Sequence, residues 1–492
     1  MAVATGSTSA LFDAGQLDGR VFSGGWKEVP GRLEVDEPAT GEILAEVGSA
    51  SRDDVFEAAK QAASAQREWA ATPGRERAAI LLAAAEALER HREEAERWIV
   101  REGGSIPPKA HHEVGFTQSE LREAATLVTR ATGEVLPDAQ GRFSVAVRLP
   151  IGVVGVITPW NFPMLLAMRS VAPALALGNA VVLKCDPHTP IAGGLVLARA
   201  FEEAGMPEGV FHVLPGGVEA GEAICEAPQV GMVSFTGSTR AGRAVGALAG
   251  GNLKRVALEL GGKSAYIVLD DADPASASSA GAWGTFLHQG QICMAAGRHI
   301  VHEKIADAYL EALSERAKRL PVGDPAREEV AIGPIINAKQ LKRVQSIVTE
   351  AADRGAQVHA GGTADGRFFP PTVLSQVALD SRAWREEIFG PVAPIVTFSD
   401  EEEAIALAND TDYGLSAGVY TSSPARGRAV AEKLHTGHVH IGDQPVNDDP
   451  GAPFGGVGAS GNGGRFGGEA NLEEFTQWRW ITQREEPATY PF

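Results

Sequence analysis

The sequence predicts an α/β fold with more than one domain, in which helices cover parallel, doubly wound β-sheets. The first observation is length: 492 residues exceed what one hydrophobic core usually serves, so two or three domains are expected. The second is that, from about Val145 onward, short β-branched runs alternate with helical stretches. Strand–helix–strand repetition places successive strands parallel, with ligands beyond their carboxyl ends.

Two amphipathic packing helices precede this region. Ser51 begins a helical pattern and Asp54 stands three residues on, a variant of the capping box. A second helix is expected over residues 74–101, where leucine and alanine recur at helical spacing between charged residues.

The alternating region divides into two α/β units, the first ending at residues 255–262 and the second running from residue 264 to about 463. The terminal run 476–482 is strand-like and aromatic, and we expect it to pack on a partner surface. The first unit's expected strands are 154–158, 180–184, 210–214 and 232–237, and its expected helices are 165–177, 193–205 and the segment around 223–227. The second unit's expected strands are 299–303, 370–374, 394–399, 416–421 and 437–442.

Composition excludes several classes of function. A formal charge of −19 and the lack of a basic stripe argue against nucleic acid. Three widely spaced cysteines without a CxxC pair favour neither a disulfide scaffold nor a thiolate metal site. No apolar stretch is long enough for a membrane span, and the first 15 residues lack the pattern of a secretory signal, so we expect a cytoplasmic protein.

Two residues stand out as candidates for chemistry. A lone cysteine is usually a small buried apolar residue, but Cys293 lies between a helix-like stretch and a strand, and Gly290 just before it permits close backbone approach. Glu259 ends an apolar strand and precedes Gly261 and Gly262. It either begins a solvated loop or, at a strand's carboxyl end, serves as a functional group that a ligand approaches across the glycines.

Two turns are candidates for binding. In residues 235–242 Gly237 permits a tight strand-to-helix turn and Ser238 offers a hydroxyl, beside helical N–H groups that suit a pyrophosphate. In residues 159–163 two prolines flank the segment of Asn161. An asparagine there is ordinarily a turn former, but a fixed amide is also a good oxyanion donor.

Two other patterns are set aside. Residues 456–461 match G-x-G-x-x-G, but neither a strand before them nor a helix after them supplies the context of a dinucleotide site. We expect a glycine-rich loop there. His435, His438 and His440 have no nearby carboxylate or cysteine cluster in the sequence, so no metal site is expected.

In this order the motifs resemble the aldehyde dehydrogenase superfamily over nearly the whole chain. They are PWNFP, VVLK, FTGST, ELGGKS, QGQICM, EEIFGPV and PFGG, and the 34-residue separation of Glu259 from Cys293 also matches. The resemblance implies a Rossmann-like NAD(P)-binding domain (residues 1–124 and 147–259), an α/β catalytic domain (260–463) and a small bridging sheet for oligomerisation (125–146 and 464–492). It also implies a homodimer or homotetramer.

The resemblance implies roles for the matching residues. Cys293 is the expected nucleophile and Glu259 the general base, while Asn161 and the Cys293 backbone N–H form the oxyanion hole. Related enzymes that transfer the acyl group elsewhere than to water usually lack the glutamate, so hydrolysis is expected. The expected cofactor contacts are Trp160, Lys184, Gly237, Ser238, Glu387 and Phe389.

The motifs leave alternatives for the cofactor, NAD⁺ or NADP⁺, and for the substrate class. Pro187 stands where many NAD⁺-using members have a ribose-binding glutamate, so we expect NAD⁺ with NADP⁺ tolerated. Residues 287–301 and 442–456 resemble the benzaldehyde and vanillin dehydrogenase branch, which favours an aromatic aldehyde over a short aliphatic one. A cofactor-free thiol hydrolase and a non-catalytic relative are the remaining alternatives. The expected substrate-pocket residues, all uncharged, are Phe162, Leu166, Ile292, Met294 and Phe454.

Overall fold

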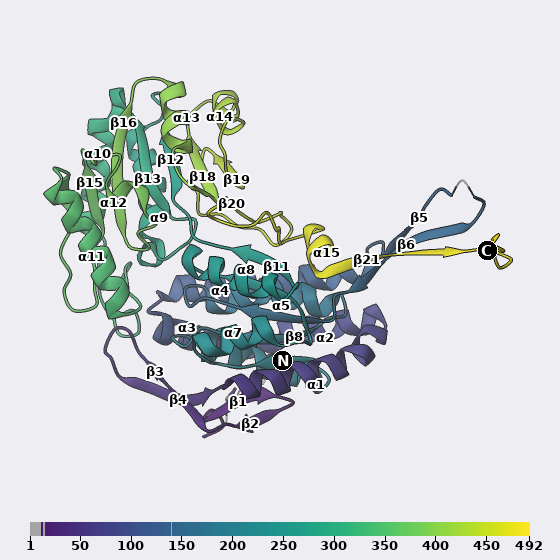
Figure 1. The fold of residues 1–492 in the computed structure, drawn as a ribbon. Helices are drawn as coiled ribbons and strands as arrows, with labels where there is room; N and C mark the ends of the chain where they lie inside the picture. The colour runs from purple at the N-terminus through teal and green to yellow at the C-terminus, as the bar shows by residue number, and fades with distance from the viewer. Residues whose placement is uncertain (1–10, 13–14, 139) are drawn as a thin grey trace, which may run out of the picture.

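The computed structural model describes residues 11–12, 15–138 and 140–492 and contains two seven-stranded sheets (Figure 1). Residues 1–10, 13–14 and 139 lie outside this description, and with them most of the N-terminal run that was examined for a secretory signal. Within the described residues, no helix is both long and apolar enough to cross a membrane.

The first sheet has the order β11-β10-β7-β8-β9-β1-β2, with β7 to β11 parallel and β1 and β2 antiparallel at one edge. The predicted alternation of strands and helices is confirmed. Its strands are β1 (Arg20–Ser23), β2 (Trp26–Glu28), β7 (Val153–Ile157), β8 (Ala180–Lys184), β9 (Phe211–Val213), β10 (Val230–Thr236) and β11 (Arg255–Glu259). The helices around it are α1 (Arg52–Ala71), α2 (Gly74–Arg90), α3 (Arg92–Gly103), α4 (Pro107–Thr126), α5 (Pro163–Ala176), α6 (Val196–Glu203), α7 (Val218–Glu226) and α8 (Thr239–Gly251).

The second sheet has the order β14-β15-β16-β13-β12-β18-β19, and only β14 runs antiparallel to its neighbour. Its strands are β12 (Ser264–Val268), β13 (Ala296–His302), β14 (Gln357–Ala360), β15 (Thr372–Ser375), β16 (Val392–Phe398), β18 (Ser416–Tyr420) and β19 (His438–Ile441). Its helices are α9 (Pro274–Phe286), α10 (Glu303–Arg319), α11 (Ala338–Asp353), α12 (Arg382–Arg385), α13 (Glu401–Asn409) and α14 (Pro424–Ala431).

Smaller elements complete the chain. A three-stranded sheet of β5 (Gly133–Val135), β6 (Phe143–Pro150) and β21 (Thr476–Gln483) projects away from both large sheets, next to α15 (Ala470–Phe475) (Figure 1). It joins the two segments expected to form a bridging sheet. The remaining elements are the hairpin of β3 (Gly31–Asp36) and β4 (Ile43–Ser49), the pair of β17 (Tyr413–Gly414) and β20 (Val457–Gly458), and the short turns η1 (Leu127–Thr129), η2 (Ile191–Leu195) and η3 (Leu287–Gly290).

Local sequence signals account for helix α1 but not for the next one. The capping box at Ser51 is present: its hydroxyl accepts from the Asp54 amide, and the Asp54 carboxylate accepts from the Ser51 amide. The single helix expected over residues 74–101 is wrong, because α2 ends and α3 begins at His91. His91 leaves helical geometry (φ −107°, ψ 19°), and its ring lies 2.9 Å from Glu203 at the end of α6.

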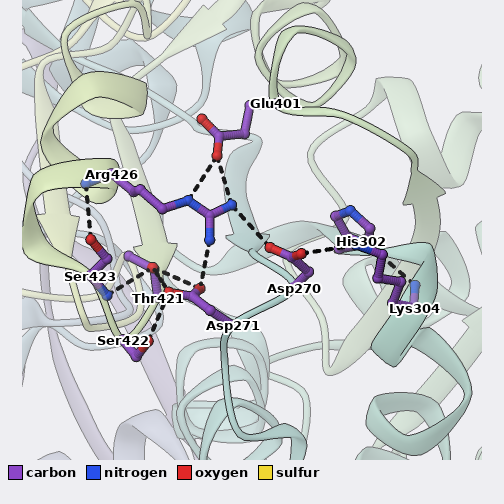
Figure 2. Close-up of polar contacts among 9 residues, drawn as sticks. All are labelled: Asp270, Asp271, His302, Lys304, Glu401, Thr421, Ser422, Ser423 and Arg426. Carbon is purple, nitrogen blue, oxygen red and sulfur yellow. Dashed lines mark hydrogen bonds and ion pairs between the residues drawn. The ribbon is translucent and has the colours of Figure 1, made fainter.

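The carboxyl edge of the second sheet carries a network of ion pairs and hydrogen bonds (Figure 2). Arg426 of α14 donates to Glu401 of α13 at 2.7 Å and to Asp270, after β12, at 3.0 Å. Asp271 accepts from the hydroxyls of Thr421 and Ser422, which follow β18. The network links the segments that follow β12, β16 and β18 to helix α14.

Candidate active site

Helices α4 and α5, the loop before β13 and the loop after β19 enclose a cavity of about 440 Å³. This volume suits a small organic molecule with a ring. Cys293 and Asn161 line it, so the structure brings the expected nucleophile and oxyanion donor to one site. All five expected substrate-pocket residues also line it: Phe162, Leu166, Ile292, Met294 and Phe454.

The two sheets contribute opposite edges to the site. In the first sheet Asn161 follows β7, Lys184 ends β8, Ser238 follows β10 and Glu259 ends β11, so all four lie at the carboxyl edge of adjacent strands. In the second sheet Cys293 precedes β13, and Glu387 and Phe389 precede β16, at the amino edge. The rule of carboxyl-end sites therefore holds for the first sheet only.

Cys293 lies just after the tight turn η3 and lines the cavity. Gly290 has φ +66°, and a Cβ there would collide with the Gly390 carbonyl, so the chain needs glycine to pass. Burial raises the pKa of the Cys293 thiol to about 12, and Arg169 opposes this shift while Glu259 adds to it. The free thiol is therefore protonated at neutral pH and must lose its proton before it can attack.

Asn161 is 3% exposed, and its amide Nδ2 donates to the Gln291 carbonyl at 2.9 Å, two residues from Cys293. An asparagine amide carries two N–H groups, so one remains for a substrate oxygen. The contact ties the loop after β7 to the loop that carries the thiol.

Glu259 is 2% exposed, and burial raises the pKa of its carboxyl to about 8, against the opposing effect of Arg169. Its Oε1 accepts from the Gly456 amide, whereas Oε2 has no hydrogen-bond partner in the described chain. The solvated-loop interpretation is thus wrong. A buried carboxyl with one unpartnered oxygen and a raised pKa has the properties of a general base.

The glycines beside Glu259 leave room for neighbouring protein groups. A Cβ at Gly261 would lie 2.5 Å from the Glu387 carboxylate, and one at Gly262 would collide with the Cys293 carbonyl. The Gly262 amide donates to Glu387 at 2.9 Å. The pair therefore lets the catalytic loop and Glu387 approach the end of β11.

The expected cofactor residues lie along the same edge. Ser238 is the N-cap of the 13-residue helix α8, and its hydroxyl accepts from the Ala241 amide. Gly237 has no positive φ, and its need for glycine is steric, since a Cβ would lie 2.6 Å from the Phe235 ring. Trp160 and Phe389 meet edge to face with ring centres 5.4 Å apart.

Two charged groups in this region fit a nucleotide with hydroxyl and phosphate groups. Burial raises the pKa of Glu387 to about 7. Lys184 is 7% exposed, and across the described residues its ammonium forms no hydrogen bond or ion pair. A nearly buried cation without a partner indicates a place for anionic or hydroxylic ligand groups.

The sequence analysis did not predict that charged residues line the cavity. Arg169 of α5 is nearly buried, forms an ion pair with Asp448, and lies 4.0 Å above the Phe454 ring. Lys109 and His112, both on α4, also line the cavity. A local signal for Arg169 was available, because an arginine in an otherwise apolar helix is rarely buried without a partner. The partner of Arg169, Asp448, lies 279 residues away, and no local sequence pattern points to it.

The two motifs set aside have structural roles here. The glycine-rich loop at 456–461 pairs with the end of β11 and supplies the amide that binds Glu259. His438 accepts from the Gly455 amide at 3.0 Å, and its ring lies 4.5 Å from that of Phe454. Among the residues that the structure describes, no group of three His, Cys, Asp or Glu side chains is placed to hold a metal ion.

Comparison with known proteins matches residues 26–481 to the model of the aldehyde dehydrogenase family. The chain is 53% identical to vanillin dehydrogenase from Amycolatopsis sp., over 98% of this chain and 100% of that protein. It is 52% identical to benzaldehyde dehydrogenase [NAD(+)] from Pseudomonas putida, over 96% and 98%. A solved aldehyde dehydrogenase from Brucella melitensis biovar abortus superposes with a TM-score of 0.93 at 34% identity, over 97% and 100%. The resemblance drawn from the motifs is confirmed.

Proposed function

The chain belongs to the aldehyde dehydrogenase family, and we propose that it oxidises aromatic aldehydes to carboxylic acids with NAD⁺. The observation that carries the proposal is the cavity over Cys293, whose largely apolar lining and volume of about 440 Å³ suit an aryl ring. The similarity to vanillin and benzaldehyde dehydrogenases supports the same substrate class.

The residues present fit the cofactor. We assign the adenosine ribose to Lys184, the pyrophosphate to Ser238 and the N-terminus of α8, and the nicotinamide ribose to Glu387. Bound NAD⁺ supplies a nicotinamide ring that accepts a hydride. Trp160 and Phe389 line the cleft, where their rings exclude water from the reacting groups.

In the first half-reaction the Cys293 sulfur bonds to the aldehyde carbon. The carbonyl electron pair moves to oxygen, and the thiol proton leaves to solvent, which the partly exposed Cys293 side chain can reach. Asn161 Nδ2 and the Cys293 amide hold the oxyanion. Collapse of the oxyanion expels the hydride from the former aldehyde carbon and leaves a thioester on sulfur.

In the second half-reaction Glu259 takes a proton from water as the water oxygen attacks the thioester. The carbon–sulfur bond breaks, the carboxylic acid departs, and Glu259 passes the proton to the departing sulfur, which restores the Cys293 thiol and the Glu259 carboxylate. The raised pKa of Glu259, about 8, makes it a stronger base than an exposed carboxylate.

The test is a comparison of kcat/KM for benzaldehyde, vanillin and propanal with purified enzyme and NAD⁺, followed by absorbance at 340 nm. We expect both aromatic aldehydes to exceed propanal by at least about tenfold, because an alkyl chain fills the aryl cavity poorly. A preference for propanal would assign an aliphatic substrate. No absorbance change with any aldehyde would support the thiol hydrolase alternative.

We also propose a homodimer or homotetramer assembled through the projecting sheet of β5, β6 and β21. Trp478, Trp480 and Ile481 of β21 are 46%, 64% and 44% exposed, and such aromatic residues are enriched at interfaces. Light scattering distinguishes the two assemblies. Three unpaired cysteines favour the reducing cytoplasm as the compartment.

The domain division expected from the resemblance remains part of the proposal. The first sheet with its helices would form the NAD-binding domain, the second sheet the catalytic domain and the projecting sheet the bridging segment. Strand β6 continues to Pro150, so the boundary expected at 146 falls inside a strand.

A further inference from the structure

A buried ion pair lies behind the loop that carries Asn161. Lys109 and Glu113 stand one turn apart on α4, with side chains 1% and 0% exposed. The Lys109 ammonium donates to the Glu113 carboxylate at 2.5 Å. Taking two charges out of water costs about as much as their attraction returns, so a pair of this kind adds little to stability by itself. Its partners indicate what else it does.

Each member of the pair also contacts the segment from residue 161 to residue 165. Lys109 Nζ donates to the Asn161 carbonyl at 2.8 Å and lies 4.2 Å from the centre of the Phe162 ring. The free oxygen of Glu113 accepts from the amides of Met164 at 2.9 Å and Leu165 at 3.3 Å.

These contacts replace local capping. Phe162 is the N-cap of α5 and makes no side-chain cap hydrogen bond, so the first amides of α5 depend on Glu113. Asn161 is consequently held at two points, its main-chain carbonyl by Lys109 and its side-chain amide by the Gln291 carbonyl.

We propose that Lys109 and Glu113 are positioning residues that hold the Asn161 amide where the oxyanion forms. The inference rests on the proposed function, in which Asn161 stabilises that oxyanion. An error of about 1 Å in a reacting group lowers rates by about 10²-fold, so a rigid support for this loop has a measurable effect on catalysis.

The experiment distinguishes an effect on the position of Asn161, measured by kcat, from an effect on folding stability, measured by Tm. Lys109→Met leaves Glu113 buried without a counter-charge, and we expect a clear fall in Tm and in kcat. The double variant Lys109→Met/Glu113→Gln removes both charges, so Tm should recover most of the loss. Its kcat should stay at least about tenfold below wild type, because the Asn161 carbonyl still lacks its donor. Recovery of kcat together with Tm would overturn the proposal.

Asn161→Ala provides the second readout. If the pair acts through Asn161, adding both substitutions to Asn161→Ala lowers kcat no further, whereas independent effects multiply. A multiplied loss would also overturn the proposal. If Asn161→Ala itself keeps wild-type kcat, the oxyanion assignment of the proposed function fails instead.

Glu37→Gln is the matched control. Glu37 is 2% exposed and accepts from the side chains of Arg101 and Thr40, neither of which belongs to the Asn161 loop or to α5. We expect this variant to change Tm but to leave kcat within about twofold of wild type.

Discussion

Glu259 accepts a hydrogen bond from the amide of Gly456, 197 residues away, at 3.4 Å through one carboxyl oxygen, and within the described chain its other oxygen has no partner. The amide holds the carboxyl in place while the second oxygen stays free for a proton. One oxygen of the Glu259 carboxyl therefore orients the side chain, and the other is available for proton transfer.

Replacing the carboxyl tests its role in hydrolysis. Glu259→Gln keeps the shape and the contact to Gly456 but removes the base, so acylation should proceed while the thioester persists. Rapid mixing with benzaldehyde and NAD⁺ should show a first equivalent of NADH and then a steady-state rate reduced by about 10²-fold or more. An unchanged steady-state rate would contradict the assignment.

The pH dependence follows from the pKa of Glu259, which burial raises to about 8. The base must be ionised to accept a proton, so kcat at saturating substrates should rise as pH increases through about 8 and level off above it. A profile of kcat from pH 6 to 9.5 checks this. Glu259→Gln should lack the rising limb, and a flat wild-type profile would exclude Glu259 as the limiting base.

Arg169 is the cation that opposes the raised pKa of the Cys293 thiol. Arg169→Met should raise this pKa further and slow alkylation of Cys293 by iodoacetamide at least about fivefold at fixed pH. Arg169→Lys keeps the positive charge and should slow the alkylation of Cys293 less. Mass mapping separates Cys293 from the buried Cys185 and Cys225, and equal alkylation rates in all three proteins would show that Arg169 has no electrostatic effect on the thiol.

Pro187 follows Lys184 by three residues, and its side chain can accept no hydrogen bond from a ribose hydroxyl. Pro187→Glu introduces a carboxylate that accepts such bonds and repels a 2′-phosphate. The ratio of KM for NADP⁺ to KM for NAD⁺ should rise at least about tenfold. Pro187→Gln is the uncharged control and should give a smaller rise; an unaltered ratio in both would place the ribose elsewhere.

Much of the site could be predicted because its signals are local. The capping box at Ser51, the alternation of strands and helices, and the short motifs around Asn161, Glu259 and Cys293 each span a few residues. Their order along the chain indicated the family, and the family model matches residues 26–481. The helix break at His91 was missed because its partner, Glu203, lies 112 residues away.

The sequence by itself determined which residues carry the chemistry, because strand ends, turns and motifs are encoded by neighbours along the chain. Only the tertiary structure decided that the second sheet presents its amino edge, that Arg169 lines the cavity of Cys293 with Asp448 as its partner, and that Lys109 donates to Asn161. The physical reason is that these contacts join residues 52 to 279 positions apart, and their strength depends on burial and distance, which no local pattern records.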